Sequence, residues 1–561
     1  MYNVWQNRYR KWLFFVFGML LTLACLPTQS TLALPYYPDH VYQQDEAVEK
    51  QYIVPSIVYS TPAFKPGRES FTSHEEMMEY LYQLQRQSDR LHVKIIGYSQ
   101  EQRPIPLLIF SKPSRSEPVD IQRLNKPVIW LQGQQHGNEP AGGEAMLVMA
   151  RKLALEELGQ TVLEKVTVLI VPRCNPDGSY YFDRRTARRI DENRDHIKLE
   201  LPETLALRQA FSAYRPYLAV DNHEYSVAGE FSRVAGHEML KYHDILLLSA
   251  TNANVPQKIK DLADGLFLDN VEKALDGQQL THHWYYTVSG TGADRQLNMG
   301  GTDAMIGRNA LGLMPALSFL VESRGIGLGR QDFLRRVTGH VVADTALLLT
   351  AAQNSDLLRQ TVEHSRSRLI AEGKSSEPGS EIVVVSKGQR RENYPFPLVD
   401  AVTGEVITLP ITVVDVKQAE PVLVRKKPKA YILPPAYLPV AKTLAQSGVT
   451  IRVLNRENRL MVESYRVTDK KVFANYFEGH FRNSVQTETS FREVTFPAGS
   501  FVITMDQPMA GIIAMSLEPE ADSGMVRFNA LPVDVNEEVP VFRYHGPGNL
   551  DMHPVDLIYT H

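Results

Sequence analysis

The chain has 561 residues, of which 43% are apolar and 22% are charged, and its formal net charge is −4. This composition excludes a disordered chain, a fibrous repeat and a small disulfide-stabilised scaffold, and the length exceeds what one compact core holds. We therefore expect two domains. Because 60 Lys and Arg residues are balanced by 64 Asp and Glu residues, the composition predicts no nucleic-acid partner held by bulk positive charge.

Residues 1–33 have the pattern of a secretory signal peptide. Three basic residues precede an apolar run over 12–26, and small and polar residues follow up to Ala33. We expect cleavage after Ala33, an exported protein in the periplasm or outside the cell, and no stable membrane span after cleavage. Two alternatives are an uncleaved membrane anchor and a lipoprotein signal with its lipid on Cys25.

The number of cysteines in the mature protein depends on whether the signal peptide is cleaved. The chain has two cysteines, and removal of the signal peptide leaves Cys174 alone. The exported protein would therefore have no internal disulfide, and its stability would come from its core. Cys174 follows an apolar run, which favours a small buried side chain over a nucleophile.

The first half of the chain has the pattern of an α/β fold. After a Tyr- and Pro-rich lead segment (34–69), the sequence predicts a helix over 75–89 and strands over 92–98 and 106–110. Short apolar runs then alternate with helical segments. The runs cover 128–131, 166–171, 217–220 and 317–321, and the clearest helices cover 143–157 and 203–214. We expect a doubly wound, mixed but mostly parallel sheet within a catalytic domain over 70–355.

A polar helix end and linker over 356–381 separate this region from a second domain over 382–561. Short alternating or apolar segments bounded by Gly, Pro and Asp predict a β-rich fold with one helix over 436–447. No ligand cluster stands out in this domain. Its role is either a packing platform that shapes the cleft or a recognition surface for cell-wall material or polypeptide.

Polar side chains follow the apolar runs of the first domain. His136 and Glu139 come after the first run, His223 after the third and Glu322 after the fourth. Because ligands gather at the carboxyl ends of strands in an open α/β sheet, we expect these groups to converge. Two imidazoles and one carboxylate with an open fourth position form the ligand set of a catalytic zinc, so one Zn²⁺ per catalytic domain is expected.

Glu322 is then free to act as general base toward a zinc-activated water. Each residue also has a purely structural alternative. His223 could be a hydrogen-bonded core histidine, and Glu322 could be an ion-pair partner of Arg324.

The motifs together resemble a known family. They occur in the order and approximate spacing of the zinc carboxypeptidases typified by carboxypeptidase A, over roughly residues 70–350, and they are His136-x-x-Glu139, Asn175-Pro-Asp-Gly178, Asp191-x-Asn193-Arg194-Asp195, His223 and Leu320-Val-Glu322. The resemblance implies a carboxypeptidase-like fold, zinc ligation by His136, Glu139 and His223, and Glu322 as the catalytic glutamate. The β-rich second domain resembles the C-terminal extension of some bacterial members.

The resemblance also implies how the substrate is bound. Asn193 and Arg194 correspond to the pair that holds the terminal carboxylate, and a guanidinium fork suits that group. A further arginine that stabilises the oxyanion falls at Arg184, with Arg185 as the near alternative. The alternative for this arginine cluster is a solvated basic loop paired with neighbouring acids.

Two departures from the family pattern are visible. Arg189 stands where a glycine is common, and Gly300 stands where a tyrosine closes over the substrate. Tyr285 and Tyr286 are candidates for that tyrosine only if the intervening loop is longer, and the alternative is aromatic packing. Asp303 and Arg308 lie in the segment expected to line the pocket for the last side chain, and the sequence does not choose between them as the source of a charge preference.

The resulting hypothesis is an exported zinc metallocarboxypeptidase that hydrolyses a peptide bond at or near a free C-terminal carboxylate. Its expected partner is a peptide or peptide-like substrate with a free carboxylate. One alternative is a zinc amidase or deacylase that acts on cell-wall peptides or N-acyl amino acids. Another is a non-catalytic binding protein on the same fold.

Overall fold

The computed structural model describes residues 41–234, 237–291, 294–374, 380–546, 548 and 550–558. The predicted signal peptide, Cys25 and residues 375–379 of the predicted linker lie outside these residues. Within them, none of the helices combines the length and apolarity needed to cross a membrane. We call residues 41–374 the first unit and residues 380–558 the C-terminal unit.

A mixed eight-stranded sheet forms the centre of the first unit, in the order β1-β2-β4-β3-β5-β12-β8-β9. Strands β4, β3, β5 and β12 are parallel, whereas β1, β2 and β8 pair antiparallel with their inner neighbours. The expected mixed α/β sheet is confirmed. The strand bounds are β1 Leu91–Tyr98, β2 Pro104–Phe110, β3 Val128–Gly133, β4 Thr167–Val171, β5 Leu218–Ser226, β8 Ile245–Ser249, β9 His282–Trp284 and β12 Leu317–Ile326.

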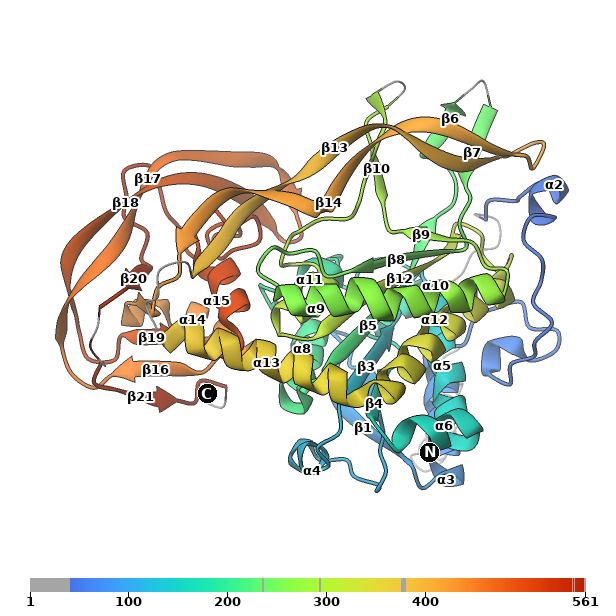
Figure 1. Cartoon of the computed structure of the whole chain (residues 1–561), viewed down its shortest axis with the longest axis horizontal. Helices are drawn as coiled ribbons and strands as arrows, with labels where there is room; N and C mark the ends of the chain where they lie inside the picture. Colours follow the sequence, from blue (N-terminus) through green and yellow to red (C-terminus); the bar gives the residue numbers. More distant parts are fainter. Residues whose placement is uncertain are drawn as a thin grey trace, which may run out of the picture.

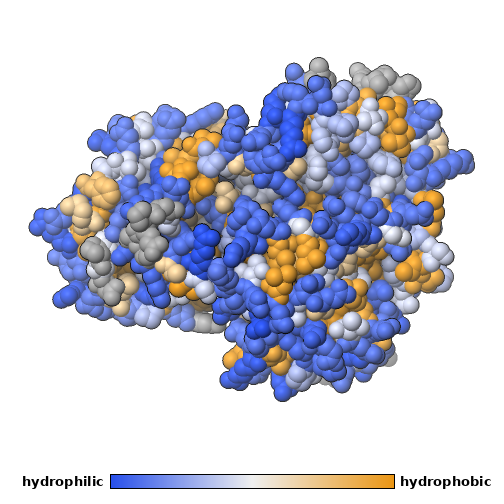
Figure 2. Space-filling view, in the orientation of Figure 1, coloured by the Kyte–Doolittle hydropathy of each residue, from blue (hydrophilic) through white to orange (hydrophobic). Residues whose placement is uncertain are grey.

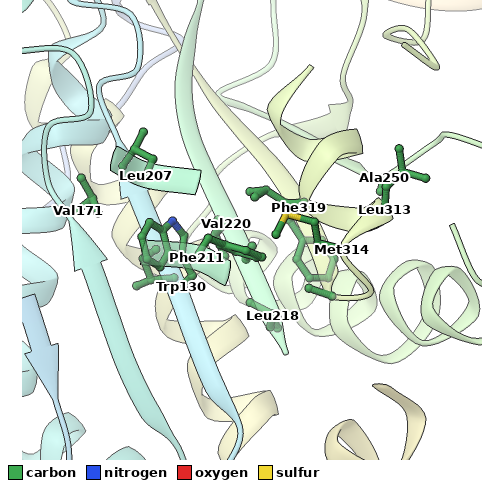
Figure 3. Packing of buried hydrophobic residues seen from close by; sticks show 14 of the residues in the cluster. Trp130, Val171, Leu207, Phe211, Leu218, Val220, Ala250, Leu313, Met314 and Phe319 are labelled. Atoms are coloured by element: carbon green, nitrogen blue, oxygen red, sulfur yellow. The ribbon is translucent and has the colours of Figure 1, made fainter. Parts of the chain in front are cut away.

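Helices cover both faces of this sheet. On one face Trp130 of β3 lies against Phe211 of α8 (Pro202–Tyr214), with ring centroids 5.5 Å apart (Figure 3). On the other face α5 (Pro140–Leu155) approaches β3 so closely that a Cβ on Gly133 would lie 2.7 Å from the carbonyl oxygen of Gly142. Cys174 is fully buried, as expected.

The remaining helices of the first unit complete these two layers or connect them. They are α2 Glu46–Glu49, η2 Pro62–Phe64, α3 His74–Gln87, α4 Pro118–Arg123, α6 Glu157–Leu163, α7 Pro176–Tyr181, η3 Glu192–Arg194, α9 Gln257–Leu262, η4 Ala263–Phe267, α10 Leu268–Gly277, α11 Gly307–Leu313, α12 Phe333–Gln353 and α13 Ser355–Lys374.

Two strands are longer than the sequence predicted. The apolar runs ended at residues 220 and 321, but β5 and β12 continue and pair Glu322 with His223 in parallel register. The end of each apolar run predicts the end of a strand, but here the backbone ladder continues through the polar residues that follow. His223 and Glu322 therefore lie inside strands, where the backbone ladder fixes their positions.

The C-terminal unit begins with a long hairpin that pairs with the first unit. Strands β13 (Glu381–Asp400) and β14 (Val406–Lys426) lie in a six-stranded sheet of order β10-β11-β14-β13-β7-β6. The other four strands belong to the first unit: β6 Phe231–Val234, β7 His237–Lys241, β10 Thr287–Ser289 and β11 Gln296–Asn298. Figure 1 shows the hairpin arching over the first unit, and we call this sheet the roof.

A third sheet of seven strands forms the body of the C-terminal unit, in the order β18-β17-β20-β15-β19-β16-β21. Its longest strands form a second hairpin, which returns toward the first unit. The element bounds are β15 Ala430–Leu433, η6 Pro435–Tyr437, α14 Leu438–Gln446, β16 Ile451–Leu454, β17 Asn458–Phe477, β18 His480–Phe496, β19 Phe501–Thr504, α15 Ala510–Leu517, β20 Phe542–Tyr544 and β21 Met552–Val555.

The lead segment from residue 41 onward packs onto both units. Val48 is buried in one apolar cluster with Leu240 of β7 and Val399 of β13, and the side chain of Gln44 accepts a hydrogen bond from Arg324 at 2.7 Å. The surface in the same orientation is mainly hydrophilic, with apolar residues in separate small groups (Figure 2). The lead segment is therefore part of the folded core around the roof.

Candidate active site

Three buried side chains form a compact donor cluster. One ligand atom from each of His136, Glu139 and His223 lies within 4.8 Å of the others. The Nδ1 atom of His136 is 2.7 Å from Glu139 Oε1, and Nδ1 of His223 is 2.9 Å from Glu139 Oε2 and 3.1 Å from Nδ1 of His136. None of the three side chains is more than 3% exposed. Two imidazole nitrogens and a carboxylate thus face one point.

The central sheet and α5 hold these donors. His136 lies in the loop after β3, and Glu139 is the residue that precedes α5. Glu139 Oε2 also accepts a hydrogen bond from the backbone N–H of Glu224 on β5, at 3.0 Å. His223 projects from β5 itself. The carboxylate therefore spans the gap between the helix start and the neighbouring strand.

Two further carboxylates hold the far nitrogens of the imidazoles. Asp191 Oδ1 lies 3.1 Å from His136 Nε2, and Asp221 Oδ2 lies 2.9 Å from His223 Nε2. Burial lowers the pKa of His223, but Asp221 and Glu139 outweigh this effect and raise it well above its ordinary value. Three carboxylates around two imidazoles make a pocket with an excess of negative charge, which fits a bound dication such as Zn²⁺.

Sequence reasoning did not assign roles to Asp191 and Asp221. For Asp221 a signal was present, because residues two apart on a strand lie on the same face and Asp221 precedes His223 by two positions. For Asp191 no local signal existed, because its contact with His136 joins two loops that are 55 residues apart.

A cleft of about 400 Å³ opens at the donor cluster. Four other predicted site residues line it together with His136, namely Glu322, Arg184, Asn193 and Arg194. The other two predicted ligands, Glu139 and His223, lie behind His136 and contact it, and Arg185 is the exception described below.

Glu322 lies on the cleft wall beside His223. Its side chain is 7% exposed, and burial raises its pKa to about 8. Arg324, considered from the sequence as an ion-pair partner, donates instead to Gln44 at 2.7 Å and to the carbonyl oxygen of Lys241 at 2.8 Å. The carboxyl group of Glu322 therefore faces the cleft and has a pKa close to neutrality.

Arg184 lies at the mouth of the donor cluster. Its Nη1 is 3.1 Å from Nδ1 of His136 and 3.4 Å from Oε1 of Glu139. Its Nε and Nη2 atoms donate to Asp191 Oδ2 at 3.1 and 2.9 Å. The guanidinium is thus fixed on one side by a carboxylate and presents a donor toward the cleft.

Asn193 and Arg194 follow in the same loop and form another part of the cleft wall. Asn193 Oδ1 accepts a hydrogen bond from the backbone N–H of Gly307 at 2.7 Å. This bond ties the loop to the start of α11, which carries Arg308. Arg194 Nη1 donates to the carbonyl oxygen of Asn193 at 2.6 Å.

Arg185 does not line this cleft. Its Nη2 is 3.6 Å from Oε1 of Glu478, and it lines a separate groove with Arg188 and Arg189. The two adjacent arginines therefore point to opposite sides of one loop. Arg184 faces the cleft and Arg185 faces the C-terminal unit.

The β10–β11 hairpin lies between Tyr285 and β12. Tyr285, at the end of β9, lines the cleft, and the guanidinium carbon of Arg308 lies 5.8 Å from its ring centroid. Tyr286 also borders the cleft but packs edge-on against Phe396 of β13, with centroids 4.9 Å apart. The alternative of aromatic packing thus describes Tyr286 better than Tyr285.

Lys241 of β7 is a further charged group in the cleft wall that the sequence did not suggest. It is 3% exposed, and its Nζ is 2.5 Å from Glu230 Oε2. No local pattern marks it, because β7 is held in place by pairing with β13.

The chain is similar in sequence to known carboxypeptidases. The family described as zinc carboxypeptidase matches residues 77–200, which include His136, Glu139 and the Asn193–Arg194 pair. Carboxypeptidase 2 of Trichophyton rubrum is 32% identical over 483 residues, covering 86% of this chain and 88% of that protein. Carboxypeptidase 2 of Trichophyton tonsurans is 32% identical over 485 residues, covering 86% of this chain and 88% of that protein.

Solved structures with some likeness include carboxypeptidase A from Helicoverpa armigera, at 16% identity, a TM-score of 0.40 and coverage of 53% of this chain and 78% of that one. The sequence relationship to the Trichophyton proteins extends over 483 residues, which is longer than the first unit and so includes part of the C-terminal unit. This chain belongs to the zinc carboxypeptidase family and is a zinc-dependent metallocarboxypeptidase.

Proposed function

We propose that the protein is an exported carboxypeptidase that removes a residue from the free carboxyl end of a peptide, with Glu322 as general base. The observation that carries the proposal is one cleft, lined by His136, Glu322, Arg184 and the Asn193–Arg194 pair, that reaches the donor cluster of His136, Glu139 and His223. These groups supply what amide hydrolysis requires: a base, an oxyanion donor and a site for the terminal carboxylate.

His136, Glu139 and His223 would hold the zinc ion. When bound, zinc supplies a Lewis acid that polarises the scissile carbonyl and makes water acidic enough to act as a nucleophile at neutral pH. Asp191 and Asp221 keep the imidazoles oriented, because each carboxylate contacts the ring nitrogen that faces away from the cluster, at 3.1 and 2.9 Å.

Glu322 takes a proton from the attacking water, whose oxygen forms a bond to the carbonyl carbon. Glu322 then passes the proton to the amide nitrogen, the C–N bond breaks, and a shortened peptide and a free amino acid leave. A pKa of about 8 suits a group that both accepts and returns a proton near neutral pH. Arg184 donates to the developing oxyanion, and Asn193 and Arg194 bind the terminal carboxylate.

Arg308 supports a preference for an acidic terminal side chain. Its guanidinium is 2% exposed in the cleft wall, its Nη2 donates to the carbonyl oxygen of Gly301 at 2.7 Å, and burial lowers its pKa to about 10. Among the ion pairs of the described residues, none involves Arg308. Asp303 competes less well as a charged group, because burial raises its pKa. A substrate carboxylate would supply the missing counter-ion.

Peptides that differ only in a free or amidated carboxyl end test the main proposal. We expect release of the last residue from the free peptide and none from the amide. The Glu322→Gln variant should lower kcat about 10²- to 10⁴-fold, because the amide cannot accept the proton, while zinc content stays stoichiometric.

Equal cleavage of the free and amidated peptides would contradict the proposal and favour the amidase alternative. Undiminished hydrolysis by Glu322→Gln would contradict the role of this residue. If the zinc-bound parent protein hydrolyses neither the free nor the amidated peptide, the non-catalytic alternative is favoured.

The metal site can be tested without substrate. Asp221→Asn should weaken zinc binding about 10- to 100-fold in competition with a chromogenic chelator, because His223 loses the carboxylate that orients it. Asp356→Asn is the matched control, since Asp356 is 82% exposed and far from the cleft. Equal zinc affinities for the two variants would contradict the site.

The preference for the last side chain gives a further prediction. Otherwise identical peptides that end in Glu, Leu or Lys should be cleaved in that order of kcat/KM. Arg308→Gln should reduce the preference for Glu over Leu about tenfold or more, which is the effect of losing one charge-assisted hydrogen bond. Asp303→Asn should leave the order unchanged, and a parent enzyme that favours Lys would overturn the assignment.

Export is tested by N-terminal sequencing of protein from the source cells. We expect the mature chain to begin at Leu34, because the signal peptide pattern places cleavage after Ala33. A chain that begins at a lipid-modified Cys25 would support the lipoprotein alternative, and one that retains residues 1–33 would contradict cleavage.

A further inference from the structure

The turn of the β17–β18 hairpin reaches from the C-terminal unit to the loop that carries the cleft arginines. Phe477 pairs with His480, so Glu478 and Gly479 form a two-residue turn, and both have positive φ, at 45° and 89°. Such turns favour Asn, Asp or Gly at the first position, because a longer side chain is strained in the left-handed region. A glutamate at this position therefore calls for a physical reason.

The contact made by its side chain supplies that reason. The carboxylate of Glu478 is 6% exposed, and its Oε2 accepts a hydrogen bond from the backbone N–H of Asp191 at 2.6 Å. The neighbouring His480 bonds through Nε2 to the carboxylate of Glu200 at 2.9 Å. The turn is thus anchored at two points on the first unit, and one of them is a backbone donor next to the active site.

Asp191 connects this anchor to the catalytic groups. One oxygen of its carboxylate contacts His136 Nε2 at 3.1 Å and accepts from the backbone N–H of Asn193 at 2.8 Å. The other accepts two hydrogen bonds from Arg184. A displacement of the Asp191 backbone would therefore shift His136, Arg184 and Asn193 together.

We propose that Glu478 is a positioning residue for the active site: through the N–H of Asp191, the C-terminal unit fixes the orientation of His136 and Arg184. The inference rests on the proposed roles of these two residues. It gives the C-terminal unit a defined part in the reaction, because the hairpin turn completes the support of a metal ligand that lies on the other unit.

Three substitutions at one position separate this role from a merely structural one. Glu478→Asn suits the positive φ of the turn better than glutamate does, but its side chain is one methylene shorter and loses the contact with Asp191. Glu478→Gln keeps the length and an acceptor oxygen. Glu478→Ala removes the side chain. Glu488→Ala is the control, because Glu488 is an exposed carboxylate on the same hairpin.

Four measurements on the full chain are compared: zinc affinity by chelator competition, kcat and KM, the melting temperature, and amide hydrogen exchange of residues 186–195 in zinc-free protein. We expect Glu478→Asn and Glu478→Ala to bind zinc about tenfold more weakly, the lower end of the range for groups that orient a ligand. Their kcat should fall about tenfold with KM nearly unchanged, and exchange of the segment should accelerate. Glu478→Gln and Glu488→Ala should stay within about threefold of the parent.

Zinc affinity and exchange in Glu478→Asn that match the parent would overturn the proposal, and so would equal losses in Glu478→Asn and Glu478→Gln. An unchanged melting temperature in Glu478→Asn together with weaker zinc binding would support it, because the turn itself would then be intact. A parent that binds zinc but releases no terminal residue would contradict the proposed function, while the zinc and exchange comparisons would still decide the role of Glu478.

Discussion

The arrangement of the cleft depends on the contacts that the carboxylate of Asp191 makes. It binds His136 on one side and Arg184 on the other, and its own backbone is held by Glu478. Because several donors share this buried carboxylate, its loss would remove a partner from the half-exposed guanidinium of Arg184 and from the buried imidazole of His136 at the same time. The loop that carries Arg184, Asn193 and Arg194 is thereby held at one residue to His136 and to the C-terminal unit.

Backbone pairing places the other half of the site. His223 and Glu322 lie opposite each other on parallel strands, so their side chains leave the same face of the sheet. A shift of one residue in this register would turn one of the two side chains to the opposite face of the sheet and separate them. The ladder therefore gives the base and one metal ligand a fixed separation, while the loops after β3 and β4 supply the remaining groups. Rigid strands and a tightly bonded loop together hold the donors without a disulfide.

The sequence predicted the parts of the site that local patterns encode. Apolar runs followed by His, Asn or Glu marked the central strands, and the family motifs named the ligand set and the Asn193–Arg194 pair. The family resemblance placed the oxyanion arginine at Arg184 with Arg185 as the near alternative. Adjacent residues in a loop face opposite directions, and only the contacts of Asp191 and Glu478 distinguish the two. The two long hairpins were also missed, since their mixed polar sequence over 381–400 and 458–477 has no sustained alternation.

The same hairpins explain why the cleft cannot be described from the first unit alone. Lys241 reaches the cleft from β7, whose register is set by pairing with Leu398 of β13. Tyr285 lies between β9 of the central sheet and β10 of the roof, so it sits where the two sheets meet. Its neighbour Tyr286 is packed against Phe396 of β13. Backbone ladders to the C-terminal unit therefore build one wall of the cleft, and the Glu478 turn supports the other, so that both sides of the substrate site depend on residues beyond 380.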